Sequence, residues 1–177
     1  AGRERFEFWD VDSLTRKSGL VLGSGGLEST WSPAITWNYA AHLLAARRGA
    51  TTVVLDDQSG DVRLKIRDVD TSLRSMALSP DGTRLATSAY QQATANEGDC
   101  GMLRVYDTVT GKPVWAAKHH GDTAGSLAWS PDGSRIAVGG WTELAVVDAR
   151  NGELLAKNSG DYSTGWIHEI AWSPTGD

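Results

Sequence analysis

A four-residue turn motif recurs along this chain and constrains its fold more than any other feature. The motif reads S-P-D-G at residues 79–82 and 130–133, and S-P-T-G at residues 173–176. A short apolar stretch precedes each copy: S-M-A-L, S-L-A-W and E-I-A-W. A unit of roughly 40 residues that repeats in this way indicates a modular β architecture.

A second marker repeats with the same period. Each unit contains an apolar run that ends at an acidic residue followed by a turn, and we expect these acids to have a structural role. They are Asp10, Asp56, Asp107 and Asp148. Extended backwards, the segment from Trp37 aligns with the S-P-D-G motif. Both markers place the extra residues of the longest unit at residues 91–100, which we interpret as a loop insertion.

The chemistry of the motif predicts tight β-hairpin turns. Proline presets φ near −65°, and Gly82 and Gly133 are expected to adopt the positive φ that closes each turn. The flanking runs are short and rich in β-branched residues, as in strands. Each unit therefore predicts four strands. Residues 40–50 (A-A-H-L-L-A-A-R-R-G-A) have a helical composition, but the repeat places a strand there.

The predicted fold is all-β, a β-propeller of four-stranded antiparallel blades. We expect about three complete blades and partial blades at both ends, and interpret the chain as part of a larger propeller. It should therefore require a complementary propeller segment or self-associate. The expected divisions are residues 1–33 (third and fourth strands of a split blade), 34–73, 74–124 and 125–166 (one blade each, the second with the insertion 91–100), and 167–177 (first strand of the next blade).

The chain resembles the WD-repeat β-propeller family, in its degenerate bacterial form with S-P-D-G turns. Trp9-Asp10 is a literal W-D pair, and Tyr106-Asp107 is a conservative variant. The family carries a Gly-His pair before the first strand of a unit. Aligned on the turn motif, His120 falls at this position, so the resemblance implies that His120 is a structural histidine that buttresses its blade.

Composition limits the classes of partner and chemistry. The net charge is −5, which argues against a general nucleic-acid role, because such proteins need a basic face. No apolar run is long enough to span a bilayer, and we expect no membrane partner and a cytoplasmic location. The G-S-G-G run at residues 23–26 lacks the further glycine of a dinucleotide loop. His119-His120 lacks the partners of a metal site, and we expect neither a metal nor a cofactor.

Two function classes are favoured, and a third is less favoured. The chain contains no G-x-S-x-G motif and is not expected to be an enzyme by itself. The first class is a scaffold or sensor module of a larger protein, binding a protein or peptide through its loops. The alternative is a propeller domain that gates a linked enzyme, such as an oligopeptidase-type hydrolase. The third is a catalytic or ligand-binding propeller that uses channel residues: Arg74, His168 and Glu169.

The resemblance also predicts where a partner binds. In such propellers, the loops that enter the first strand share one face with the loops between the second and third strands. The turn motifs lie on the opposite face. Trp, Tyr and Arg side chains often dominate binding energy. The candidate partner-binding residues are Arg74, Tyr162, Trp166 and His168.

Overall fold

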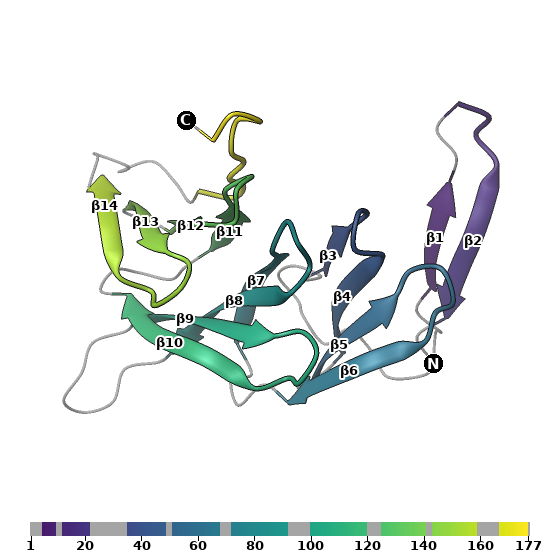
Figure 1. Cartoon of the computed structure of the whole chain (residues 1–177), viewed down its shortest axis with the longest axis horizontal. Coiled ribbons are helices and arrows are strands. Elements are labelled where there is room, and N and C mark those ends of the chain that lie inside the picture. The colour runs from purple at the N-terminus through teal and green to yellow at the C-terminus, as the bar shows by residue number, and fades with distance from the viewer. Residues whose placement is uncertain are drawn as a thin grey trace.

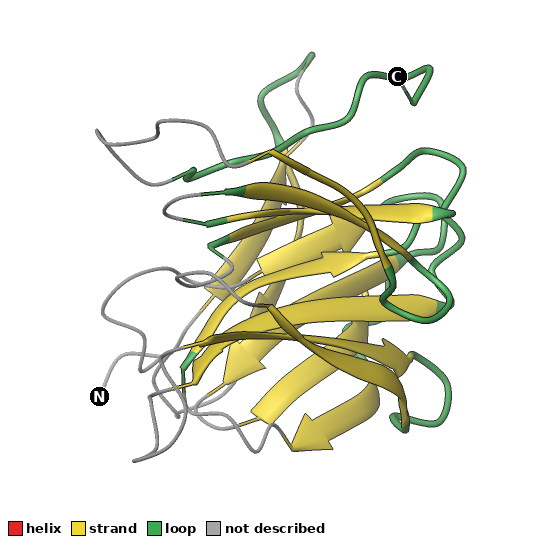
Figure 2. Ribbon diagram, turned by 90° about the vertical axis from the view of Figure 1, so that its left-hand side faces the viewer, coloured by secondary structure: helices red, strands yellow, loops and turns green. Residues whose placement is uncertain are grey.

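The computed structural model is built of β-strands. The structure describes residues 5–9, 12–21, 35–48, 51–67, 72–91, 100–119, 125–140, 143–158 and 167–176. The strands are β1 (Arg5–Trp9), β2 (Arg16–Val21), β3 (Ile35–Asn38), β4 (Leu43–Arg48), β5 (Thr51–Asp56), β6 (Val62–Arg67), β7 (Leu73–Leu78), β8 (Arg84–Gln91), β9 (Cys100–Asp107), β10 (Pro113–His119), β11 (Ser126–Trp129), β12 (Arg135–Gly139), β13 (Leu144–Asp148) and β14 (Leu154–Asn158). None of the described residues is helical, as the turn motifs predict (Figure 2).

The strands form three four-stranded antiparallel sheets and one hairpin. The sheets contain β3–β6, β7–β10 and β11–β14, each in sequence order, and β1 pairs with β2. The sheets follow one another along an arc, with the β1–β2 hairpin at one end and the C-terminal segment at the other (Figure 1). The innermost strand β7 contacts both β3 and β11. The predicted fold class is confirmed, and each sheet is a propeller blade.

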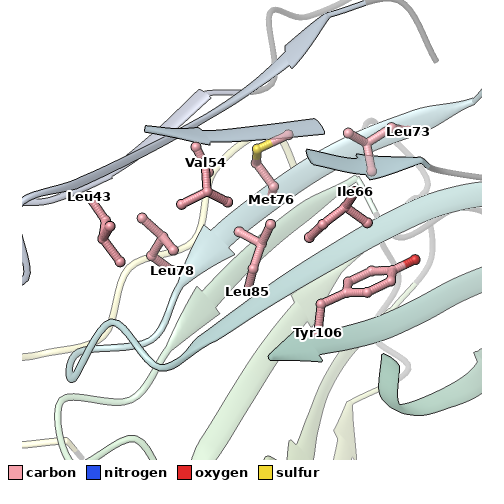
Figure 3. Packing of buried hydrophobic residues seen from close by; sticks show 9 residues of the cluster. Leu43, Val54, Ile66, Leu73, Met76, Leu78, Leu85 and Tyr106 are labelled. Atoms are coloured by element: carbon pink, nitrogen blue, oxygen red, sulfur yellow. The ribbon is translucent and has the colours of Figure 1, made fainter. Parts of the chain in front are cut away.

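Apolar side chains fill the spaces between blades, because both faces of the middle strands are covered. Between the first two sheets lie residues such as Leu43, Val54 and Leu85 (Figure 3). A second cluster, which includes Leu103 and Ile136, joins the second sheet to the third. On the other face of β4 and β5 lie four buried residues: Leu44, Ala46, Val53 and Leu55. Leu43–Arg48 is therefore a strand, buried over residues 43–47, despite its helical composition.

The S-P-D-G turns are held by their own side chains. The Gly82 N–H donates to the Ser79 carbonyl at 2.9 Å, and the Arg84 N–H donates to Ser79 Oγ at 2.9 Å. The Ser79 hydroxyl in turn donates to Asp81 Oδ1 at 2.6 Å. The turn at residues 130–135 repeats this pattern. Gly82 and Gly133 have φ of 72° and 70°, which confirms the predicted left-handed conformation.

The structure corrects the predicted register of the first complete blade. Trp37 pairs with Leu44 as Leu78 pairs with Leu85, so Asn38, and not Trp37, is the equivalent of Ser79. Asn38 takes over the role of the serine, because its Oδ1 accepts a hydrogen bond from the Ala41 N–H at 3.0 Å. The turn Y-A-A-H at residues 39–42 contains neither proline nor glycine. Because these markers are missing, the alignment of Trp37 with Ser79 was wrong by one residue.

Two other predicted boundaries also change. Gln91 and Cys100 pair with each other at the ends of β8 and β9, so the predicted loop 91–100 includes two strand residues. Residues 92–99 lie outside the described part of the chain. The predicted strand at 167–177 is not paired as a strand over residues 167–176, because no described strand lies in hydrogen-bonding position beside it. This segment instead packs on the third sheet, where Trp172 Nε1 donates to the Ala128 carbonyl at 3.0 Å.

Candidate partner-binding site

Arg74 lies at an irregularity in the innermost strand of the second blade. Leu73 pairs with Ala89 and Ser75 pairs with Ser88, so Arg74 is an extra residue between the two pairs. Such a β-bulge re-aims the side chain of the extra residue, and bulges are common beside functional sites. The backbone therefore directs the Arg74 side chain away from the regular alternation of the strand.

The Arg74 side chain is half-buried and incompletely hydrogen-bonded. Its guanidinium carbon lies 5.9 Å from the centroid of the Tyr90 ring, a cation–π geometry. Its Nε atom is buried and has no hydrogen-bond partner among the described residues. A buried N–H without an acceptor costs free energy.

Tyr90 and the start of β7 are held together by backbone contacts. The Tyr90 N–H donates to the Ser72 carbonyl at 3.1 Å, and the Ser72 hydroxyl donates to the Tyr90 carbonyl. Arg47, which is only 7% exposed, donates from Nη1 to the Leu73 carbonyl at 3.1 Å. Two guanidinium groups, Arg47 and Arg74, therefore approach the same end of β7. This arrangement can attract a carboxylate or another anionic group.

His168 has the same place in its segment as Arg74 has in β7. Arg74 stands four residues before Leu78 and His168 four before Trp172, and these two residues precede the serine of their turn motifs. His168 is exposed. Arg74 and His168 therefore lie toward the same end of the strands. The third blade stands between them, because Arg74 belongs to the second blade and His168 follows the third. The other predicted partner-binding residues, Tyr162 and Trp166, lie outside the described residues, as do the predicted structural residues His120 and Asp10.

The acids at the ends of β5, β9 and β13 accept hydrogen bonds from the turns that follow them. Asp56 Oδ1 accepts from the N–H of Ser59 at 2.9 Å, and Asp107 Oδ1 accepts from the N–H of Thr110 at 2.8 Å. These backbone N–H groups are the main cause that lowers the pKa of Asp56 and of Asp107 to about 2. For Asp148, the Arg150 guanidinium is the main cause of a pKa of about 2.

Sequence reasoning missed Tyr90 and Arg47. Arg47 follows the apolar run L-L-A-A at residues 43–46. A charged residue on a buried strand is unusual, and this was the feature of the sequence that could have indicated its role. Tyr90 gave no signal, because its relation to Arg74 depends on the register between β7 and β8. A second missed cluster, at the turn after β3, contains Trp37, Tyr39, His42 and Asp57. Trp37 Nε1 donates to Asp57 Oδ2 at 2.6 Å, and Trp37 and Tyr39 form an edge-to-face pair with centroids 5.7 Å apart.

The described residues contain no group of three or more His, Cys, Asp or Glu side chains that could hold a metal ion. The same part of the chain includes no helix of the length and apolar character that a membrane span requires. What this end of the strands presents is a set of hydrogen-bond donors and an aromatic ring.

Comparison with known proteins supports the assignment of the fold. A chain in the crystal structure of the mitotic checkpoint complex superposes with a TM-score of 0.70 and 17% sequence identity, covering 98% of this chain and 49% of that chain. Residues 95–175 match the family model of the anaphase-promoting complex subunit 4 WD40 domain. The fold is that of a β-propeller.

Two curated relatives are similar to part of this sequence. Both are ribosome biogenesis proteins named ERB1. The protein of Coccidioides immitis is 31% identical over 99 residues, which are 53% of this chain and 11% of the relative. That of Chaetomium thermophilum is 38% identical over 60 residues, 33% of this chain and 6% of the relative. The aligned region thus spans about a tenth or less of the relatives' length.

Proposed function

We propose that this chain is a non-enzymatic interaction module. It binds a segment of a partner protein at the end of the strands where Arg74 lies. The observation that carries the proposal is the incompletely bonded guanidinium of Arg74, re-aimed by a bulge onto the Tyr90 ring. Proteins with the WD40 fold that resemble this chain include a component of the mitotic checkpoint complex. The S-P-D-G turns of this chain suggest the bacterial form of the WD-repeat family.

The chemistry of the site favours an acidic segment as the ligand. Arg74 and Arg47 supply positive charge at the start of β7, whereas the chain as a whole has a net charge of −5. A local basic spot on an acidic protein directs an acidic segment to one place, because the remaining surface repels it. Tyr90 adds an aromatic surface beside the charge. Arg and Tyr are among the residues that most often dominate binding energy.

Affinity capture with matched variants tests this proposal. The immobilised wild-type chain is used to isolate binding proteins, whose affinities for Arg74→Ala and Arg150→Ala are then measured. Arg150 is the control, because it is an arginine that is exposed and ion-paired with Asp148 in an outer turn of the third blade. We expect Arg74→Ala to weaken binding about fivefold or more and Arg150→Ala to leave it unchanged. Equal affinities for the two variants contradict the proposal.

A further inference from the structure

Strand β6 has an outer edge that no described strand covers. It is the last strand of its sheet and pairs with β5 alone. Figure 1 shows it on the outer side of the arc, away from the innermost strands β3 and β7. Because blades contact one another through the faces of their sheets, a neighbouring blade leaves this edge exposed. The outward N–H and C=O groups of such a strand are a template for pairing with another chain.

The inward side chains of β6 hold the strand in place. Ile66 is 4% exposed and belongs to the apolar cluster between the first two sheets, and Leu64 packs against the same cluster. Leu64 also lies against the next blade, since a Cβ at Gly111 would be 2.9 Å from its Cδ1 atom. The edge is therefore ordered before a ligand arrives, which lowers the entropic cost of pairing with it.

The opposite face of β6 carries a pair of basic residues, Lys65 and Arg67, which we call the basic pair. Lys65 pairs with Val53 and Arg67 pairs with Thr51, so the two side chains share one face of the sheet at alternate positions. Both residues are exposed. Neither side chain makes an ion pair or a hydrogen bond within the described part of the chain. Two positive charges thus stand along the edge without a counter-charge.

The other outer strands lack such a pair. β10 and β14 contain one lysine each, and Lys157 of β14 is ion-paired with Glu143. Within β6, Arg63 is likewise ion-paired, with Asp56, and does not add to the basic pair. β6 contains no acidic residue. The edge of the first complete blade therefore differs from the other two in its uncompensated charge.

This charge pattern selects the kind of chain that can pair with the edge. Antiparallel pairing of β6 strands from two copies would bring the two basic pairs together on one face, and like charges across a ladder are destabilising. A strand with acidic residues at alternate positions instead places a carboxylate beside each positive charge. The residues between these acids lie on the face of Leu64 and Ile66, where apolar side chains suit the surroundings.

We propose that β6 is a docking edge for an extended acidic segment of a partner protein, which adds to the first complete sheet as a fifth strand. Backbone hydrogen bonds supply the pairing, and the basic pair selects acids at alternate positions with apolar residues between them. The net charge of −5 disfavours a nucleic acid at the same place. This edge is separate from the Arg74 site, since Arg74 belongs to the innermost strand of the next blade.

A labelled peptide of alternating glutamate and valine is the probe, and fluorescence anisotropy measures its affinity. A peptide of the same composition, with its glutamates grouped at one end, should bind the wild-type chain about fivefold or more weakly. Arg67→Glu should weaken binding of the alternating peptide by about fivefold or more. Arg150→Glu reverses the same charge at an exposed arginine of the third blade and should bind as wild type does. Lys65→Glu combined with Arg67→Glu should prefer a peptide of alternating lysine and valine.

Backbone pairing is tested with two N-methylated forms of the glutamate–valine peptide. Successive amides of an extended strand point to opposite sides, so one alternate set faces β6 and the other faces solvent. Methylation of the set that faces β6 removes its donors and should weaken binding about tenfold or more. Methylation of the other set should be tolerated. Amide hydrogen exchange in β6 should also slow when the unmodified peptide is bound.

Four outcomes overturn the proposal. The first is no binding of the alternating peptide up to ~1 mM. The second is equal affinity for the alternating and grouped peptides, which would mean that the edge responds to charge alone. The third is an equal effect of the two methylated sets, because the peptide would then not add as a strand. The fourth is tighter binding of a single-stranded oligonucleotide than of the peptide, which would assign the basic pair to a nucleic acid.

Discussion

Trp129 Nε1 donates a hydrogen bond to the backbone carbonyl of Ala77, 2.9 Å away and across the boundary between two blades. The indole fills the space between neighbouring innermost strands and also satisfies a backbone acceptor there. Trp172 repeats this contact with Ala128. A tryptophan at this position therefore fixes the distance between successive blades on the inner side of the arc, where β7 contacts both β3 and β11.

Replacing the Trp129 indole with a smaller ring should weaken the contact between the second and third blades while the space between them stays filled. Trp129→Phe keeps an aromatic ring but removes the N–H donor, and we expect a loss of about 1 kcal/mol in the free energy of unfolding. Urea denaturation measures this change. The control is Trp9→Phe, at an indole that is 54% exposed in the β1–β2 hairpin. Equal losses for the two variants would show that the contact with Ala77 contributes nothing.

Two turn glycines with the same backbone conformation should respond differently to alanine. Gly152 and Gly133 have φ of 77° and 70°, so a side chain is strained at both positions. Only at Gly152 would the added Cβ meet a ring, 2.7 Å from Trp115, whereas at Gly133 the nearest atom is 3.7 Å away. Gly152→Ala should therefore lower the free energy of unfolding by about 1 kcal/mol or more beyond Gly133→Ala. Thermal unfolding of the two variants compares these costs, and similar midpoints would count against the packing of Trp115 on this turn.

The reverse change at Leu14 should stabilise the chain. Leu14 occupies the glycine position of its turn with φ of 51°, which disfavours a residue with a Cβ. Leu14→Gly should raise the free energy of unfolding by a few tenths to about 1 kcal/mol, while Leu14→Ala should not. The measurement is a urea titration at low protein concentration, where association does not contribute. An unchanged or lower midpoint for Leu14→Gly would contradict the strain argument.

Acid should destabilise the fold over a defined range of pH. The pKa values of Asp56, Asp107 and Asp148 are lowered to about 2 in the folded chain, from an ordinary value of 3.8. A group with a depressed folded pKa contributes stability above its unfolded pKa, and this contribution is lost as pH falls toward the folded pKa. The urea midpoint should therefore fall between about pH 4 and pH 2. Asp107→Asn should make this fall shallower, and an identical slope would exclude Asp107 as a contributor.

The periodic features of the fold could be predicted, because each depends on residues close together in the sequence. The positive φ of Gly82 and the strand at Leu43–Arg48 are examples, since local turn chemistry and the repeat determine them. The register at Trp37 was wrong by one residue because the turn after Asn38 lacks proline and glycine. At the candidate site, arginine at position 74 suggested binding. The bulge and the Tyr90 ring beside it depend on how β7 pairs with β8, which no local pattern encodes.

The affinity of Arg74→Ala for a partner that the wild-type chain captures is the most direct test of the proposed interaction module. The comparison requires Asp132→Ala, which changes a turn at the opposite end of the strands. Both variants should first be shown to unfold at the same temperature as the wild-type chain, so that a change in affinity reflects the binding surface and not the fold. We predict that Arg74→Ala weakens the complex about fivefold or more while Asp132→Ala binds as wild type does. Full affinity in Arg74→Ala together with lost affinity in Asp132→Ala would contradict the account, because the partner would then bind the turn face.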